Sequence, residues 1–269
     1  MVTFPPCKIN LGLNVIAKRE DGYHNLETCF FPVPWTDILE IIPSSETVFT
    51  SSGISILGKV EDNLCLKAYY LLKEEFKLPP VKIHLHKIIP IGAGLGGGSS
   101  DAAHTVRLLN AIFSLCLSSE QLKKYAAQLG SDCSFFIQDE PMLGSGRGEI
   151  LNPISISLTG FHLILIKPSI HISTKEAYEG LTPKMSNHKL AEILKRPVLQ
   201  WKGLLKNDFE ESIFSRNPGV FKIKDVLYQK GAVYTSMSGS GSTVFGLFDK
   251  SVSLKDDFTE MDYWEGILD

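Results

Sequence analysis

Apolar and polar residues alternate along the first part of the chain. Between residues 7 and 16 the odd positions are apolar, while Lys8 and Asn10 occupy even positions. A period of two predicts a strand with one face in the core and these two polar residues on the other face. Asp21 and Gly22 then favour a tight reversal. The same pattern predicts further strands over residues 26–33, 37–42, 47–57 and 81–86.

Apolar residues at helical spacing follow these strands. Asp62 or Asn63 can cap a helix that runs to about residue 76, and Ser118 with Gln121 forms a capping box for a helix that runs to residue 129. A further helix occupies the residues just after position 101, where small and apolar residues recur every three or four positions.

The second half of the chain has a different character. We predict strands over residues 133–137, 161–166, 232–236 and 243–248, and helices over residues 174–180, 187–195 and 218–229. A polar stretch over residues 149–160 contains Pro153 and separates the two halves. The mixture of strands and helices predicts an α/β (α+β) fold with two domains, residues 1–150 and residues 151–269.

Composition narrows the class of protein. The 269 residues carry a net charge of −3 and no block of like charge, which argues against a nucleic-acid-binding protein. No apolar run approaches the length of a membrane span, and the first residues lack the regions of a signal peptide. The five cysteines show no C-x-x-C spacing, which is typical of free thiols in a reducing compartment. We expect a cytoplasmic protein that binds neither nucleic acid nor a membrane, and the oligomeric state stays open.

A glycine-rich stretch joins the predicted strand at 81–86 to the helix after position 101. Its glycines permit positive φ angles and a close approach of the backbone to a ligand. Ser99, Ser100 and Asp101 are N-cap residue types, and we interpret Asp101 as an N-cap rather than as a magnesium ligand. Backbone N–H groups and the helix dipole would converge on one place, which suits a phosphate. The predicted phosphate loop comprises Pro90, Ile91, Gly92, Ala93, Gly94, Leu95, Gly96, Gly97, Gly98, Ser99 and Ser100.

Two other phosphate-binding loops fit this stretch less well. A Walker A loop needs Lys-Ser or Lys-Thr after the glycines, and neither follows them here. Gly92, Gly94 and Gly97 satisfy the G-x-G-x-x-G pattern of a dinucleotide site. The strand before them alternates as an antiparallel strand does, and Glu120, near the required distance of about 20 residues, opens another helix. A mononucleotide site is therefore favoured over an NAD(P)-binding site.

Three motifs occur in a fixed order. They are Lys-Ile-Asn-Leu at 8–11 with Asp-Gly-Tyr-His at 21–24, the loop at 90–100, and Ser-Gly-Ser-Gly at 238–241. Together they resemble the GHMP kinases, the small-molecule kinases that include galactokinase, homoserine kinase and mevalonate kinase. The resemblance covers nearly the whole chain up to residue 248. It implies a two-domain fold with the active site in the cleft between the domains, and the use of ATP and Mg²⁺.

The spelling of the first two motifs is characteristic of one branch of that family. Its substrate is a cytidine diphosphate-linked methylerythritol of the non-mevalonate isoprenoid pathway, which is phosphorylated on its 2-hydroxyl. By resemblance, Lys8 and Asp132 match the catalytic lysine and aspartate. An aspartate can accept the proton of an attacking hydroxyl, and an ammonium within about 4–6 Å keeps it ionised. The other matches are substrate-binding Asn10, Tyr23, His24, Thr174 and Tyr178, and ATP-binding Asn63 and Lys87.

The sequence identifies no magnesium ligands, and three alternatives to this function stay open. Another GHMP kinase, acting on homoserine, mevalonate or a sugar, would share the loop and the base but would need no nucleobase pocket. An NAD(P)-dependent oxidoreductase would use the G-x-G-x-x-G pattern. A non-catalytic nucleotide-binding module would bind ATP without phosphoryl transfer.

Overall fold

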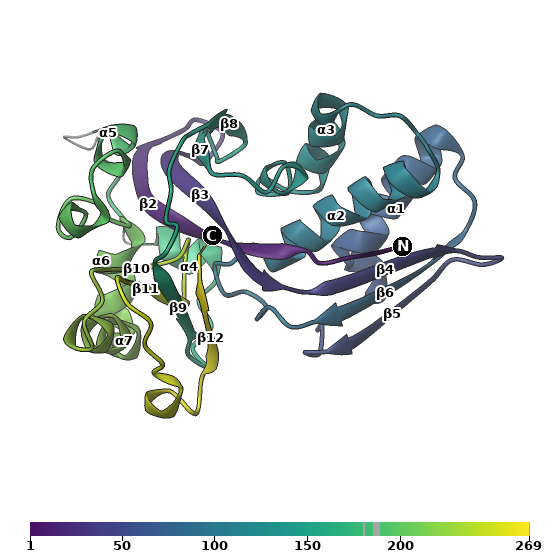
Figure 1. Ribbon diagram of the computed structural model, residues 1–269. Helices are drawn as coiled ribbons and strands as arrows, with labels where there is room; N and C mark the ends of the chain where they lie inside the picture. Colours follow the sequence, from purple (N-terminus) through teal and green to yellow (C-terminus); the bar gives the residue numbers. More distant parts are fainter. Residues whose placement is uncertain (180, 185–188, 269) are drawn as a thin grey trace. The chain divides into compact units, whose positions relative to one another are not determined.

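The computed structural model describes residues 1–179, 181–184 and 189–268 (Figure 1). Contacts between Cα atoms divide the chain into two compact units, neither of which is one continuous segment. The first unit contains Met1–Lys8, Pro32–Ile91 and Gly96–Glu140, and the second contains Ile9–Phe31, Gly92–Leu95 and Pro141–Asp269. This division differs from the expected one at residue 150, because a hairpin near the N-terminus folds with the second half of the chain.

The first unit is built on a four-stranded sheet in the order β1–β4–β6–β5. Its strands are β1 (Val2–Thr3), β4 (Ile38–Pro43), β5 (Val48–Gly53) and β6 (Val81–Lys87). β6 lies antiparallel to β4 and parallel to β5. The expectation of an antiparallel strand before the glycine loop is confirmed for the pairing with β4 and is wrong for the pairing with β5. The sheet is not the doubly wound parallel sheet of a dinucleotide-binding domain.

Helices cover one face of this sheet (Figure 1). They are α1 (Leu64–Phe76) and α2 (Gly97–Ile112), and α3 (Ser119–Leu129) packs against both of them. The unit also contains the 3₁₀ turns η1 (Val60–Asp62) and η2 (Phe135–Ile137). Asn63 caps α1 by accepting a hydrogen bond from the Cys65 N–H, and the capping box of Ser118 and Gln121 opens α3, as expected. The predicted strand at 133–137 is wrong. An apolar run without alternation does not distinguish a strand from a helical turn, and all three residues of η2 are buried.

The second unit contains two antiparallel sheets. The sheet β2–β3–β7–β8 consists of β2 (Pro6–Lys18), β3 (His24–Thr36), β7 (Met142–Ser145) and β8 (Ile150–Pro153). The start of β2 and the end of β3 belong to the first unit. The sheet β10–β11–β9–β12 consists of β9 (His162–Lys167), β10 (Tyr234–Met237), β11 (Val244–Phe248) and β12 (Asp262–Ile267). The sequence pattern missed β7, β8 and β12. β12 lies beyond the last motif, where it pairs with the whole of β9.

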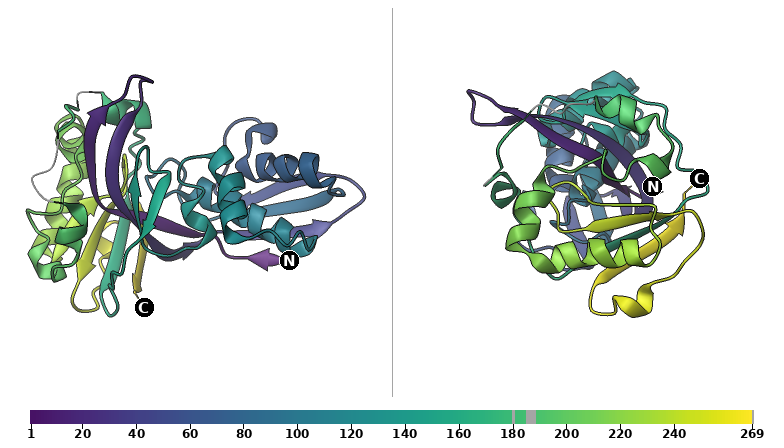
Figure 2. Two further views of the ribbon diagram at one scale, coloured as in Figure 1. Left: turned by 90° about the horizontal axis from the view of Figure 1, so that it is seen from above. Right: turned by 90° about the vertical axis from the view of Figure 1, so that its left-hand side faces the viewer.

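Short helices complete the second unit. They are α4 (Thr174–Tyr178), α5 (Leu190–Leu194), α6 (Phe209–Arg216), α7 (Pro218–Gln229) and the 3₁₀ turns η3 (Val198–Gln200) and η4 (Lys255–Asp257). α7 packs on β10 and β11 (Figure 2), and Ile223, Leu227 and Phe248 are buried in the core between them. The ends of two predicted helices, at 180 and at 187–188, lie outside the described residues. None of the helices formed by the described residues is long and apolar enough to cross a bilayer.

Candidate active site

The expected catalytic pair, Lys8 and Asp132, lies within the first unit. Lys8 Nζ is 3.7 Å from Asp132 Oδ2, and the two side chains are 4% and 32% exposed, respectively. Burial lowers the pKa of the Lys8 ammonium, and the Asp132 charge opposes this effect. The pair therefore presents a partly exposed carboxylate with a buried cation beside it. Such a carboxylate can accept a proton from a hydroxyl group.

The start of α2 lies beside this pair. Gly96 occupies the N-cap position with φ +70°, so the expectation that Asp101 is the N-cap is wrong. A Cβ on Gly96 would lie 3.0 Å from the Phe136 ring and 3.2 Å from Lys8 Cε, which shows how closely the backbone approaches the lysine stem. The first N–H groups of a helix have no acceptor within it. Those of α2, beginning at Gly97, are available to an anion.

The middle of the glycine loop, Gly92–Leu95, belongs to the second unit and is held there by the third motif. Ser238 Oγ donates a hydrogen bond to the Gly94 carbonyl at 2.9 Å and accepts one from the Asn10 N–H at 3.3 Å. Gly94 has φ +77°, and a Cβ there would lie 2.1 Å from the Ser238 carbonyl oxygen. Only glycine fits. The sequence motif marked this turn, but Ser238 was not predicted as a residue of the site.

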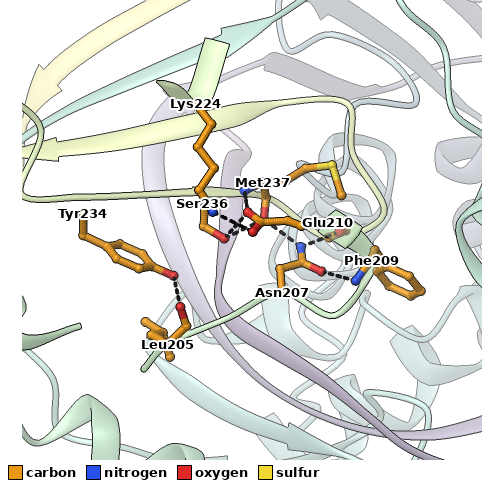
Figure 3. A network of polar contacts seen from close by, with 9 residues as sticks. Leu205, Asn207, Phe209, Glu210, Lys224, Tyr234, Ser236 and Met237 are labelled. Carbon is orange, nitrogen blue, oxygen red and sulfur yellow. Dashed lines mark hydrogen bonds and ion pairs between the residues drawn. The ribbon is translucent and has the colours of Figure 1, made fainter. Parts of the chain in front are cut away.

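The turn that carries Ser238 is itself held by polar side chains (Figure 3). Asn207 Nδ2 donates to the carbonyl oxygens of Met237 at 2.7 Å and Gly239 at 2.8 Å. The Glu210 carboxylate accepts a hydrogen bond from the Met237 N–H at 2.8 Å. Asn207 and Glu210 lie just before and within α6, a helix that the sequence pattern missed. The sequence pattern therefore did not predict that these two side chains hold the turn.

Aromatic rings from the β2–β3 hairpin and from α4 meet in the second unit. The rings of His24 and Tyr178 stack with their centroids 4.5 Å apart and an interplanar angle of 18°. The ring of Phe209 meets the ring of Tyr178 edge-on, with the two centroids 4.9 Å apart. Burial and the Lys18 charge lower the pKa of His24, which favours a neutral imidazole. Thr174 is exposed at the start of α4, the helix that ends at Tyr178.

Tyr23 stands apart from that stack. Its side chain is 57% exposed, and the Arg147 guanidinium carbon lies 4.8 Å from the centroid of its ring. Arg147 comes from the turn between β7 and β8, whose Gly146 carbonyl accepts a hydrogen bond from the Leu26 N–H at 2.7 Å. The ring of Tyr23 thus has one face covered by a cation. The sequence did not predict Arg147 as a neighbour of the site.

Three other predicted residues are engaged in contacts within the protein. Asn10 Nδ2 donates to Thr28 Oγ1 at 2.9 Å, and Asn63 caps α1. Lys87 is 3% exposed and donates to carboxylates of two buried aspartates. In the part of the chain that the structure describes, no group of three or more His, Cys, Asp or Glu side chains could hold a metal ion.

Comparisons with known proteins show the family of the chain. The chain matches the family models described as GHMP kinases N terminal domain, over residues 63–140, and GHMP kinases C terminal, over residues 190–261. The 4-diphosphocytidyl-2-C-methyl-D-erythritol kinase of Cytophaga hutchinsonii is 54% identical over 250 residues, which are 93% of this chain and 93% of that protein. The protein of the same name from Parabacteroides distasonis is 47% identical over 270 residues and covers 100% of both chains.

Solved structures give the same result. A crystal structure of 4-(cytidine 5'-diphospho)-2C-methyl-D-erythritol kinase is 30% identical, has a TM-score of 0.83, and covers 100% of this chain and 99% of its own. The mevalonate kinase of Methanococcus jannaschii, at 17% identity, has a TM-score of 0.72, covers 99% of this chain and 96% of its own, and shares the fold. The resemblance that the three motifs predicted is confirmed. The chain belongs to the GHMP kinase family and has the two-domain fold of that family.

Proposed function

We propose that the chain is an ATP-dependent kinase that phosphorylates the 2-hydroxyl of 4-diphosphocytidyl-2-C-methyl-D-erythritol, a step in the synthesis of isoprenoid precursors. The observation that carries this proposal is the Lys8–Asp132 ion pair, whose lysine stem packs against Gly96 at the start of α2. A general base, a cation and a helix N-terminus can together accept the proton, stabilise the transition-state charge and hold the phosphates in phosphoryl transfer to an alcohol. The names of the full-length relatives support the choice of alcohol.

Asp132 is the proposed base. Its carboxylate is exposed enough to reach a substrate hydroxyl and lies 3.7 Å from the Lys8 ammonium. It accepts the proton of the hydroxyl while the oxygen attacks the γ-phosphorus. Lys8 orients the carboxylate, and its ammonium stabilises the negative charge of the transition state. Burial of Lys8 strengthens this electrostatic effect, because water does not screen it.

The glycine loop is the proposed phosphate site. Residues 90–100 supply backbone N–H groups, and α2 directs the positive end of its dipole toward the same anion. We also assign Asn63 and Lys87 to the nucleotide site: Asn63 is held there as the cap of α1, and Lys87 supports the site from within the protein. Magnesium enters as part of the substrate Mg-ATP, on which it neutralises phosphate charge and is held by phosphate oxygens and water.

The rings of the second unit are the proposed cytidine site. Tyr23, His24 and Tyr178 offer aromatic faces, and a neutral imidazole can both donate and accept hydrogen bonds with a pyrimidine. Asn10 and Thr174 complete the proposed set of substrate-binding residues. We further infer a cytoplasmic location, because both substrates are charged nucleotides that do not cross a membrane unaided.

The test is ADP release by the purified protein with Mg-ATP and one of three alcohols. We expect turnover with 4-diphosphocytidyl-2-C-methyl-D-erythritol and none with mevalonate or homoserine. Turnover with only mevalonate or only homoserine would support the assignment as a kinase but would contradict the proposed cytidine site. Binding of ATP without turnover on any of the three would favour a non-catalytic nucleotide-binding module. Titration with free CDP checks the base site independently of the chemistry.

A further inference from the structure

Three charged side chains are buried together in the first unit. Lys87, the last residue of β6, donates a hydrogen bond from Nζ to Asp101 Oδ2 at 2.9 Å and another to Asp37 Oδ2. Each of the three side chains is at most 3% exposed. Asp37 immediately precedes β4 and Asp101 belongs to α2, so the ammonium connects two strands to one helix. We refer to Asp37, Lys87 and Asp101 as the ionic brace.

The ionic brace also fixes the segment that enters the glycine loop. Asp37 Oδ1 accepts hydrogen bonds from the N–H groups of Ile88 at 2.6 Å and Ile89 at 2.8 Å. These two residues connect the end of β6 to Pro90, the first residue of the loop. One carboxylate thus holds the ammonium with one oxygen and the backbone before the loop with the other.

Gly97 is the point at which the ionic brace touches the loop itself. A Cβ on Gly97 would lie 2.9 Å from Lys87 Nζ, which is too close unless the ammonium shifts, and 3.0 Å from Ile89 Cγ2, which is a tight contact. Gly97 is buried and has ordinary helical φ, so packing rather than conformation requires glycine there. A Cβ on the next residue, Gly98, would meet only Leu64 Cδ1, at 3.9 Å. The first turn of α2 therefore rests on the brace at Gly97 and is open at Gly98.

Stability alone does not account for this arrangement. Two carboxylates share one ammonium, and Asp101 Oδ1 is buried with no hydrogen-bond partner among the described residues. The pKa of Asp101 is raised to about 7, because burial and the Asp37 charge raise it by more than the Lys87 charge lowers it. Buried ion groups of this kind contribute little more than apolar residues of similar size would, whereas they fix geometry well. The ionic brace thus has the properties of a device that sets position.

We propose that the ionic brace positions Gly97 and the first turn of α2 for binding the triphosphate of ATP, so that Asp37, Lys87 and Asp101 are positioning residues of the kinase. This inference rests on the proposed function, since it takes ATP as the ligand of the loop. It gives Lys87 an indirect role: the ammonium supports the loop from within the protein and does not itself contact the nucleotide.

Substitutions at Asp101 test the hydrogen bond that connects Lys87 to α2. Asp101→Ala removes the connection between Lys87 and α2 but leaves the pair of Lys87 and Asp37. We expect KM for ATP to rise about tenfold or more, because small misplacements of binding groups are costly, while KM for the cytidyl substrate stays within about twofold. Asp101→Asn keeps an oxygen that accepts from Lys87 and is expected to retain the wild-type KM for ATP. Thr105→Ala, a truncation one turn further along α2, is the matched control and is expected to leave KM for ATP unchanged.

Two results would overturn the proposal. The first is a folded Asp101→Ala variant that binds ATP as tightly as the wild type. The second is a loss of ATP affinity in Lys87→Met that Asp101→Ala does not share, since this pattern would mean direct contact between the ammonium and the nucleotide. Gly97→Ala checks the contact point independently: it is expected to weaken ATP binding about tenfold, whereas Thr105→Ala changes it little.

The measurement keeps this inference separate from the proposed function. ATP affinity is determined by calorimetry as well as by kinetics, and no acceptor alcohol is present in the calorimeter. If the wild type binds ATP but phosphorylates none of the three alcohols, the proposed function fails. The calorimetric comparison of Asp101→Ala, Asp101→Asn and Thr105→Ala then still decides whether the ionic brace positions the loop.

Discussion

The proposed phosphoryl-transfer region of the first unit and the proposed nucleobase-binding region of the second unit are built differently. The first consists of buried charges and backbone: the side chains of Lys8 and Lys87 are at most 4% exposed, and Gly96 and Gly97 pack against them. The second consists of aromatic rings at the end of a hairpin and on a helix of five residues, and Tyr23 is 57% exposed. One region is fixed by charge and sterics, and the other by ring contacts at the surface.

This difference follows from what each region is proposed to do. Charge that develops in a transition state is stabilised by groups already held in place, because no energy is then spent on reorganising them. A nucleobase is bound in the ground state through its faces and edges, and such contacts each contribute modestly. Changes in the first region should therefore affect kcat or ATP binding strongly. Changes in the second region should affect the affinity for the cytidyl group mildly.

The largest effect is expected from Asp132→Asn. The amide has the shape of the carboxylate but does not accept the proton, so kcat should fall about 10²–10⁴-fold while ATP affinity changes little. Steady-state kinetics and calorimetry measure the two quantities. Asp139→Asn, which alters another ion-paired aspartate of the first unit, serves as the control and should retain kcat. An unchanged kcat in Asp132→Asn would remove this residue from the chemistry.

A smaller effect is expected from Tyr178→Ala. The substitution removes the ring that stacks on His24, and loss of one aromatic contact of about 1 kcal/mol should weaken CDP binding about fivefold. Tyr178→Phe keeps the ring and should bind CDP normally. Phe221→Ala, at an exposed ring of the same unit, controls for general loss of aromatic surface. A collapse of kcat with unchanged CDP affinity would contradict the contrast between the two regions.

The sequence predicted the first region in part. The alternation of apolar and polar residues predicted that Lys8 lies on a strand, and the run of glycines predicted the phosphate loop. Both predictions were possible because each pattern lies within one short segment. The ionic brace was not predicted, since Lys87 reaches Asp37 across 50 residues and Asp101 across 14. Asp101 was instead interpreted as an N-cap from its residue type. Pairings between distant segments depend on the tertiary fold, which a local pattern does not contain.

The second region was less predictable. The motif marked Tyr23 and His24 but not which ring would stack on Tyr178, and the structure gives that place to His24. Arg147 lies in the turn of a hairpin whose strands have four residues each, too short for a clear periodic signal. The part of the site that comes from short elements was therefore missed, whereas the part that comes from long strands and helices was found.

The pH dependence of stability should differ between the wild type and Asp101→Asn. Burial raises the pKa of Asp101 from 3.8 to about 7, so the folded protein binds this proton more tightly than the unfolded chain does. Its contribution therefore favours folding at low pH and is lost as the pH rises from about 4 to 7. Asp101→Asn removes the titrating group and should be more stable than the wild type at pH 8 by at least about 1 kcal/mol. Urea unfolding at pH 5 and pH 8 measures the difference, and Thr105→Ala should keep the wild-type dependence.

The smallest expected effect concerns Arg147, whose guanidinium covers one face of the exposed Tyr23 ring. A cation–π contact at an exposed site contributes about 0.5–1 kcal/mol, so Arg147→Ala should raise KM for the cytidyl substrate about two- to fivefold and leave KM for ATP unchanged. A double-mutant cycle with Tyr23→Leu isolates the contact: if Arg147 acts through the ring, its substitution has no further effect once the ring is gone. Additive effects would show that Arg147 acts on the substrate directly. The nucleobase-binding region would then also contain a charge that acts on the substrate. The two regions would differ only in how much they rely on charge.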